Sequence, residues 1–321
     1  MSIQKIAVLT SGGDAPGMNA AVRAVTRKGI FHELEIYGVH HGYEGLLRRD
    51  IRRMELGSVA DIIHRGGTML QTARCLAMLT EEGQAEAAAA LRERGITGLV
   101  VIGGDGSYRG AQSLARRGVN VVGVPGTIDN DILGTELTIG FDTAVNTVIE
   151  AVSKLRDTAS SHERAFIVEV MGRNCGDIAL RSGLGIGAET IIIPEVPYDL
   201  IEIGQKIQRG IKRGKNHSII IVAEGAGDAR EIGARLHEIA GVESRVTILG
   251  HVQRGGSPSA ADAVLATRMG ARAVEALLGG ESEVMVAAWH NEIILRPLSL
   301  AFAERPPFDG EIYKLADQLA I

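Results

Sequence analysis

The chain has 321 residues, 45% of them apolar, and its 34 Lys and Arg against 39 Asp and Glu leave a net charge of −5. This length predicts about two domains, and the apolar content excludes a disordered chain. The acidic balance and the low aromatic content of 3% argue against a protein that binds nucleic acid or an anionic membrane.

Cysteine content and the N-terminal residues bear on the compartment. Cys75 and Cys175 lie far apart and form no CxxC pair, which favours a reducing compartment and argues against a zinc site. Neither a signal-peptide pattern nor a run of 18 uncharged apolar residues occurs. We therefore expect a cytoplasmic α/β protein without a membrane span.

Short β-branched runs alternate with helical patterns along most of the chain. The runs predict buried strands over Ile6–Leu9, Leu99–Ile102, Val121–Val124, Phe166–Val170, Ile191–Ile193, Ile219–Val222 and Val246–Leu249. Because these runs are apolar almost throughout, we expect parallel sheets covered on both faces. The alternation predicts a doubly wound arrangement with right-handed crossovers.

Two of the intervening segments carry helical patterns. Glu81–Arg94 begins with acidic residues and has Arg92 and Arg94 near its end, as the helix dipole favours. Thr143–Asp157 has one apolar stripe, which consists of Ala144, Val145, Val148, Ile149, Val152 and Leu155. Both segments are predicted to pack against a sheet.

Glycine-rich segments follow the predicted strands, at the strand ends where doubly wound sheets bind ligands. Gly12 and Gly13, with Pro16 nearby, predict the opening of a helix whose N–H groups can hold phosphate. Taken alone, these glycines are better explained by a plain strand-to-helix turn. The usual dinucleotide and Walker patterns do not occur.

Gly103-Gly104-Asp105-Gly106-Ser107 places one carboxylate among glycines after a later strand. Such an Asp can hold Mg²⁺ beside a polyphosphate, while the glycines leave room for it. Ser107 is positioned to cap the next helix. The alternative is that Asp105 itself caps the helix or closes a turn, so the motif indicates nucleotide binding more than a particular acceptor.

Thr127-Ile128-Asp129-Asn130-Asp131 places two carboxylates two residues apart in a short loop. They would repel each other unless cations lie nearby. A phosphoryl-transfer site supplies such cations and needs a carboxylate to accept the proton of the acceptor hydroxyl. The alternative, a solvated turn rich in Asp and Asn, is weakened by the apolar strand just upstream.

Isolated arginines also occur in loops and at strand ends; they are Arg74, Arg164, Arg173, Arg245 and Arg254. Each one alone fits a surface role, but guanidinium groups bind phosphate oxygens through two hydrogen bonds. In an acidic chain, five of them suggest a small phosphorylated ligand. Taken alone, His251 would be a structural histidine and Glu224 a helix cap. Together with these arginines, they become candidates for the same ligand site.

Five segments together resemble the bacterial 6-phosphofructokinases, in order and at compatible spacing. They are TSGGDAPGMNAAVRA (10–24), VVIGGDGSYRGA (100–111), GTIDNDI (126–132), VMGRNCGD (170–177) and LGHVQRGGSPSAAD (249–262). The resemblance implies two doubly wound, Rossmann-like, three-layer domains with mostly parallel sheets and an active site in the cleft between them. We expect a larger ATP-binding domain at 1–140 plus 252–303, and a smaller sugar-phosphate-binding domain at 141–251 plus 304–321.

The resemblance also assigns roles in a glycolytic kinase that uses ATP and fructose 6-phosphate. The catalytic group comprises Asp129, as general base for the 1-hydroxyl, with Thr127, Asp131, Arg173 and Arg74. The ATP contacts are Gly13, Tyr43, Arg74, Cys75, Gly104, Asp105, Gly106, Ser107 and Gly110, and Asp105 would hold Mg²⁺. The sugar-phosphate contacts are Thr127, Asp129, Arg164, Met171, Gly172, Arg173, Glu224, Arg245, His251 and Arg254. Of these, Arg164 and Arg245 would come from a neighbouring subunit.

Two glycines favour ATP over diphosphate as the donor. Relatives that use diphosphate carry Asp in place of Gly106 and Lys in place of Gly126, and we expect the two glycines to leave space for the nucleotide. A diphosphate-dependent form, a kinase for another sugar phosphate, and a silent nucleotide-binding regulator are the alternatives. The silent regulator is disfavoured because it could have lost the catalytic residues, and all of them are present: Asp105, Asp129, Asp131 and Arg173.

The resemblance further implies a cytoplasmic homotetramer with an effector pocket between subunits for ADP or phosphoenolpyruvate. That pocket maps onto Arg23, Arg27, Ser58, Asp61, Arg156, Gly187, Glu189, Arg213 and Lys215. One of its arginines is replaced by Leu56, which predicts weak effector control because a charged hydrogen bond contributes about 1.5–3 kcal/mol. A second departure is the apolar segment 75–79, where relatives often carry basic residues.

Overall fold

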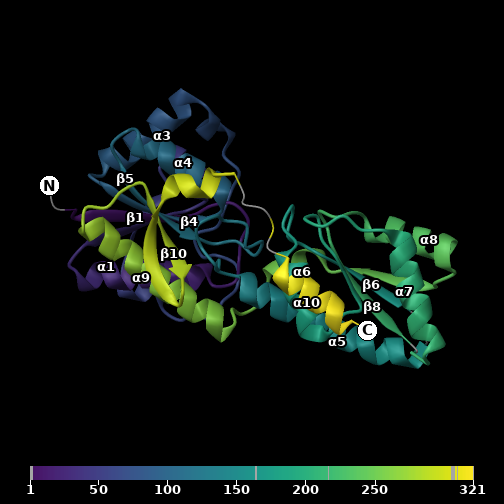
Figure 1. Cartoon of the computed structure of the whole chain (residues 1–321). Coiled ribbons are helices and arrows are strands. Elements are labelled where there is room, and N and C mark those ends of the chain that lie inside the picture. Colours follow the sequence, from purple (N-terminus) through teal and green to yellow (C-terminus); the bar gives the residue numbers. More distant parts are fainter. Residues whose placement is uncertain (1–2, 163–164, 216, 305–307, 309, 321) are drawn as a thin grey trace. The chain divides into compact units, whose positions relative to one another are not determined.

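The computed structural model describes residues 3–162, 165–215, 217–304, 308 and 310–320, and the chain divides into two compact units (Figure 1). Unit 1 comprises Met1–Asp142 and Arg254–Arg305, and unit 2 comprises Thr143–Gln253 and Pro306–Ile321. No helix within the described ranges is both long and apolar enough to cross a membrane.

Unit 1 contains a seven-stranded sheet in the order β11-β10-β5-β4-β1-β2-β3. Its strands are β1 (Lys5–Thr10), β2 (Glu35–Val39), β3 (Ile51–Met54), β4 (Gly98–Gly103), β5 (Asn120–Pro125), β10 (Val284–Trp289) and β11 (Glu292–Pro297). The inner strands are parallel, and only β3 and β11 pair antiparallel, at the two edges. The three strands predicted for this part of the chain are confirmed as β1, β4 and β5.

Helices cover both faces of this sheet, which makes unit 1 three-layered. They are α1 (Met18–Phe31), α2 (Gly42–Leu47), α3 (Glu81–Glu93), α4 (Asp105–Ala115) and α9 (Ala260–Leu278), with short 3₁₀ turns η1 (Leu56–Val59), η2 (Leu76–Leu79) and η4 (Leu298–Phe302). Figure 1 shows α1 beside α9 on one face and α3 beside α4 on the other. Along β4, Leu99 and Val101 join the core on the α3–α4 side.

Unit 2 contains a fully parallel sheet in the order β7-β8-β6-β9. Its strands are β6 (Ala165–Val170), β7 (Thr190–Ile192), β8 (Ser218–Ala223) and β9 (Ser244–Ile248), and its helices are α6 (Asp177–Ile186), α7 (Leu200–Lys212), α8 (Ala229–Ala240) and α10 (Glu311–Leu319). The turn η3 (Gly250–Arg254) and helix α5 (Phe141–His162) carry the chain across the unit boundaries. The α/β, doubly wound class is thus confirmed.

Strand β9 corrects one prediction. We predicted buried strands throughout, yet none of the residues of β9 is buried. The reason is topological, because β9 is an edge strand with β6 as its only neighbour. The strand itself and its parallel pairing agree with the prediction.

Helix starts differ from the sequence prediction in two places. Helix α1 begins at Met18, after Gly17 with φ of 106°, so Gly12 and Gly13 lie in the preceding loop and do not open the helix. Helix α4 begins at Asp105, which leaves Ser107 inside the first turn and not at the cap. The predicted helix at 81–94 is confirmed as α3, whose Thr80 hydroxyl accepts from the Gly83 N–H at 3.1 Å.

Candidate active site

Three loops of unit 1 meet at one edge of its sheet. Gly103 and Pro125 pair at the carboxyl ends of β4 and β5, and the Gly126 N–H donates to the Gly103 carbonyl at 3.1 Å. The Ser11 N–H donates to the Ile102 carbonyl at 2.9 Å, which joins the Gly12–Gly13 loop to the same place. The segments that carry Asp105 and Asp129 are therefore neighbours, as the sequence predicts.

The loop that contains Asp129 is buried and tightly hydrogen-bonded. Asp129 is 1% exposed, and its N–H donates to the Thr127 hydroxyl at 3.2 Å. The Thr138 hydroxyl donates to the Thr127 carbonyl at 2.7 Å, and the Thr127 N–H donates to the Ile139 carbonyl at 3.1 Å. A solvated turn is thereby excluded, and Thr138 is a supporting residue that the sequence did not indicate.

The glycines around Asp105 leave space beside its carboxylate. A Cβ atom built on Gly104 or on Gly106 meets no atom within 4 Å. Asp105 is the first residue of α4, in the positively polarised first turn of that helix. Within the described ranges, no group of three or more His, Cys, Asp or Glu side chains could hold a metal. A single carboxylate beside open space fits Mg²⁺, which usually shares one or two carboxylates with the phosphates of a substrate.

Gly126 does not behave as predicted. It is buried, and a Cβ there would lie 3.1 Å from both Ile102 Cγ2 and Met18 Cε. The expectation that Gly126 leaves open space is therefore wrong, because the Ile102 and Met18 side chains already occupy the position of a Cβ atom there. Only Gly106 supports the steric part of the donor argument.

Tyr43 and Gly110 lie against each other beside α4. The Tyr43 hydroxyl donates to the Ser107 carbonyl at 2.5 Å, and a Cβ on Gly110 would lie 2.7 Å from the Tyr43 ring. Cys75 packs against the hydrophobic core cluster that contains Tyr43, and burial raises the pKa of the Cys75 thiol. Beyond it, η2 is anchored by buried Met78 and exposes two leucines. Four of the predicted ATP contacts are thus brought together.

The Gly13 loop is covered by an arginine. The Arg254 guanidinium donates to the Asp14 carbonyl at 3.2 Å, and a Cβ on Gly13 would lie 2.3 Å from its Nη1. Arg74 is exposed at the end of a segment that is held to β1, since the Thr10 hydroxyl donates to the Gln71 carbonyl at 3.0 Å. An open cavity of about 450 Å³ beside it is lined by Asp14, His41, Thr68, Gln71 and Thr72.

In unit 2, Glu224 holds the loop that follows β6. Its Oε1 accepts from the Gly172 N–H at 3.2 Å and from the Arg173 N–H at 2.8 Å. Gly172 has φ of 135°, a backbone conformation in which a side chain is strained, and a Cβ there would lie 2.3 Å from the Cys175 carbonyl oxygen. Glu224 therefore caps no helix, and it joins Met171, Gly172 and Arg173 into one group.

The remaining predicted sugar-phosphate contacts are exposed or lie outside the described ranges. Arg245 on β9 and His251 on η3 are exposed, and both belong to segments next to β6. Arg164 lies outside the described residues. The sequence prediction for these three residues remains a prediction.

The residues predicted to bind an effector fall into two groups, one in each unit. In unit 1, Arg23 and Arg27 are one turn apart on α1, which contacts η1, and Ser58, Asp61 and Leu56 (51% exposed) lie on or next to η1.

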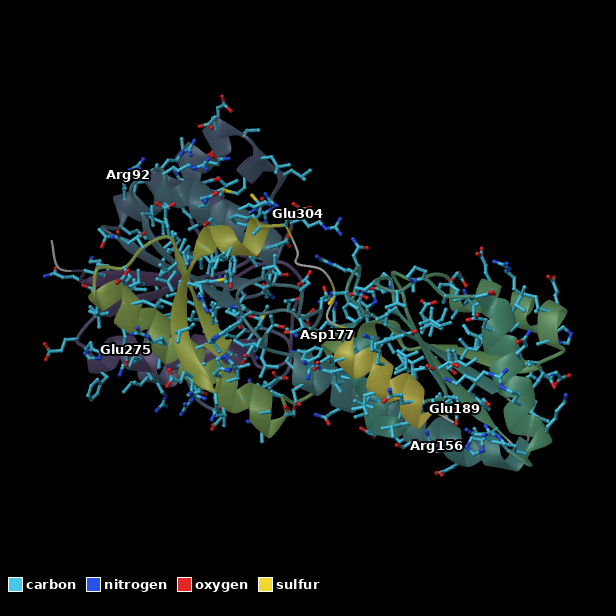
Figure 2. All side chains as sticks on the ribbon, in the orientation of Figure 1. Arg92, Arg156, Asp177, Glu189, Glu275 and Glu304 are labelled. Carbon is cyan, nitrogen blue, oxygen red and sulfur yellow. The ribbon has the colours of Figure 1, made fainter. Side chains whose placement is uncertain are left out.

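In unit 2, Lys215 Nζ lies 2.6 Å from Glu189 Oε1, and Glu189, Arg213 and Lys215 line one pocket. Arg156 on α5 donates to the Ile186 carbonyl, next to Gly187 (φ 64°). Figure 2 labels Arg156 and Glu189, both on unit 2. The unit 2 residues thus form a basic group that contains one carboxylate.

Comparison with known proteins agrees with this geometry. The family model described as Phosphofructokinase matches residues 5–277. The chain is 57% identical over 319 residues to the ATP-dependent 6-phosphofructokinase of Shouchella clausii and 56% identical to that of Bacillus mycoides, covering 99% of this chain and 100% of each relative.

Solved structures with similar folds carry the same family name. Phosphofructokinase from Saccharomyces cerevisiae superposes with a TM-score of 0.87 at 40% identity, over 99% of this chain and 48% of that one. The pyrophosphate-dependent phosphofructokinase of Marinobacter aquaeolei has a TM-score of 0.85 at 21% identity, over 99% of this chain and 92% of that one, which supports the fold alone. The chain therefore belongs to the phosphofructokinase family.

Proposed function

We propose that this protein transfers the terminal phosphoryl group of MgATP to the 1-hydroxyl of fructose 6-phosphate, which gives fructose 1,6-bisphosphate and ADP in glycolysis. The observation that carries the proposal is the pairing of two loops at the ends of β4 and β5, with Asp129 buried in one and Asp105 beside open space in the other. The 57% identity to an ATP-dependent relative over the full chain favours this donor and this acceptor.

Asp129 acts as the general base in this proposal. A carboxylate fixed by its surroundings can accept the proton of the 1-hydroxyl as the oxygen attacks phosphorus, and such a base contributes about 10²–10⁴-fold to the rate. Thr127 fixes the Asp129 backbone through its hydroxyl. Asp131 lies beyond the turn and completes the catalytic loop.

Cationic groups offset the charge of the phosphoryl group during transfer. Asp105 would hold Mg²⁺, which when bound neutralises charge on the phosphate oxygens. Arg74 and Arg173 would contact the transferred group through their guanidinium forks. The glycines at 104 and 106 let the phosphates of ATP approach the backbone N–H groups of α4. The adenine ring of ATP would lie near Tyr43, Cys75 and Gly110.

The sugar phosphate is bound by residues from the loops that follow β6, β8 and β9. Met171, Gly172 and Glu224 would contact the sugar, while His251 and Arg254 would bind the 6-phosphate with Arg164 and Arg245 of a second subunit in a homotetramer. We accordingly propose an ATP-binding domain at 1–140 plus 252–303 and a sugar-phosphate domain at 141–251 plus 304–321.

We propose that control of the activity by the effectors ADP and phosphoenolpyruvate is weak. ADP or phosphoenolpyruvate would bind the two basic groups described above, one supplied by each of two subunits, and Leu56 removes one guanidinium from that set. A steep sigmoidal response to phosphoenolpyruvate that micromolar ADP relieves would contradict this part of the proposal.

The decisive experiment measures initial rates with fructose 6-phosphate or another sugar phosphate as the acceptor and either ATP or diphosphate as the donor, each with Mg²⁺ or with EDTA. We expect turnover with ATP and Mg²⁺ only, restored after EDTA by added Mg²⁺. Turnover with diphosphate would indicate the diphosphate-dependent alternative, and turnover only with another sugar phosphate would change the acceptor. No turnover with any pair would favour a silent nucleotide-binding regulator.

A further inference from the structure

Gln253 is a fully buried side chain whose amide makes two hydrogen bonds. Its Oε1 accepts from the Met171 N–H at 3.2 Å, and its Nε2 donates to the Gly250 carbonyl at 3.0 Å. Both ends of the amide are therefore used on backbone groups. No part of Gln253 is exposed to a ligand, which separates it from the residues proposed to touch the substrate.

The two bonds join the loop after β6 to the turn after β9. Strands β6 and β9 are parallel neighbours, and the Leu249 N–H still donates to the Glu169 carbonyl at 3.1 Å. Past that point the two segments turn away into loops, and the Gln253 side chain bridges them. One loop carries Met171 and Gly172, and the other carries His251.

We infer that Gln253 is a positioning residue that sets the spacing between the sugar contacts and the 6-phosphate contacts. The inference rests on the proposed function, in which the first loop contacts the sugar and the second contacts its phosphate. Both loops must contact one small ligand at the same time, so a shift of about 1 Å between them can cost on the order of 100-fold in efficiency. An apolar side chain would leave the buried Met171 N–H and the half-buried Gly250 carbonyl without these bonds, and the loops would move to find new partners.

The test compares Gln253→Leu with Gln208→Leu in the full-length protein. Gln208 is a matched control, because it lies in the same unit and its Nε2 donates to the Ala240 carbonyl at 2.6 Å, away from the proposed site. For Gln253→Leu we expect the KM for fructose 6-phosphate to rise at least tenfold, with the KM for ATP within about twofold of the wild type. Gln208→Leu is expected to change neither KM. Equal KM values in the two variants would overturn the inference.

A second variant, Gln253→Glu, separates positioning from a general loss of packing. The new carboxyl can still accept from the Met171 N–H, but it can donate to the Gly250 carbonyl only when protonated. Burial raises the pKa of such a carboxyl. At each pH, the KM of Gln253→Glu for fructose 6-phosphate is divided by that of the wild type. This ratio should be closer to one at pH 6 than at pH 8, or close to one at both pH values.

If Gln253→Leu is impaired and Gln253→Glu recovers at neither pH, the residue serves packing alone and the inference fails. Wild-type turnover of fructose 6-phosphate is measured in the same series. Its absence would refute the proposed function, whereas the ratios between variants test only Gln253.

Discussion

Removal of the hydroxyl should change the free energy of unfolding in opposite directions at two buried tyrosines in the core of unit 1. Tyr108 on α4 is fully buried, and its hydroxyl has no hydrogen-bond partner among the described residues. Tyr43 on α2 belongs to the same core cluster, but its hydroxyl donates to the Ser107 carbonyl at 2.5 Å. Burial raises the pKa of both phenols, so both hydroxyls stay protonated at neutral pH.

The magnitudes follow from the cost of burying polar groups. A buried hydroxyl without a partner costs roughly 1–3 kcal/mol, so Tyr108→Phe should raise the free energy of unfolding by about 1 kcal/mol after the loss of its packing contacts. Tyr43→Phe removes one buried hydrogen bond to the Ser107 carbonyl, which lies within α4, so it should lower that free energy by about 1 kcal/mol. The variants should therefore differ by about 2 kcal/mol.

The single tryptophan provides the assay. Trp289 ends β10 in unit 1, so its fluorescence during urea unfolding reports the unit that contains both tyrosines. Midpoints measured at equal m-values convert directly into differences in free energy. A Tyr108→Phe variant that is destabilised by 1 kcal/mol or more would refute the reasoning, because it would mean that the hydroxyl is satisfied.

Three other substitutions test the catalytic loop, the sugar loop and a helix cap. Asp129→Ser should lower kcat by about 10²–10⁴ and change the KM for fructose 6-phosphate much less; near-normal turnover would remove Asp129 from the mechanism. Gly172→Ala forces a strained φ of 135° and a Cβ 2.3 Å from the Cys175 carbonyl oxygen, so the KM for fructose 6-phosphate should rise about tenfold in steady-state kinetics. Thr80→Ala removes the cap on the Gly83 N–H and should cost about 1 kcal/mol in thermal unfolding, with kcat unchanged as its control.

The sequence predicted seven strands from their apolar runs and missed β2, β3, β10 and β11. Strands β2 and β3 are short, mix buried residues with exposed or half-buried ones and lie towards one edge of the sheet, so they lack a continuous apolar run. Strand β11 is an edge strand whose residues are exposed or half-buried. Strand β10 is different, since four of its six residues are buried and its signal was present in VMVAAW.

Asp105 and Asp129 could be singled out as candidates from the sequence, whereas the residues that support their loops could not. Asp105 and Asp129 stand out from the sequence as carboxylates among glycines or beside an apolar strand. Thr138 and Gln253 are ordinary polar residues whose roles depend on backbone groups brought close by the fold. The packing of Gly126 against Met18 likewise depends on tertiary contacts, which is why its predicted open space was wrong.

Backbone strain marks the loops that the proposal uses. Asn130, Arg173 and His41 all have positive φ, at 51°, 53° and 62°. Such conformations cost roughly 1–3 kcal/mol in residues with side chains, and they persist only where other contacts fix them. Asn130 is fixed by a hydrogen bond from its Nδ2 to the Glu136 carbonyl at 3.3 Å. Since local preference opposes these conformations, tertiary contacts must impose them, and such contacts cannot be predicted from the local sequence.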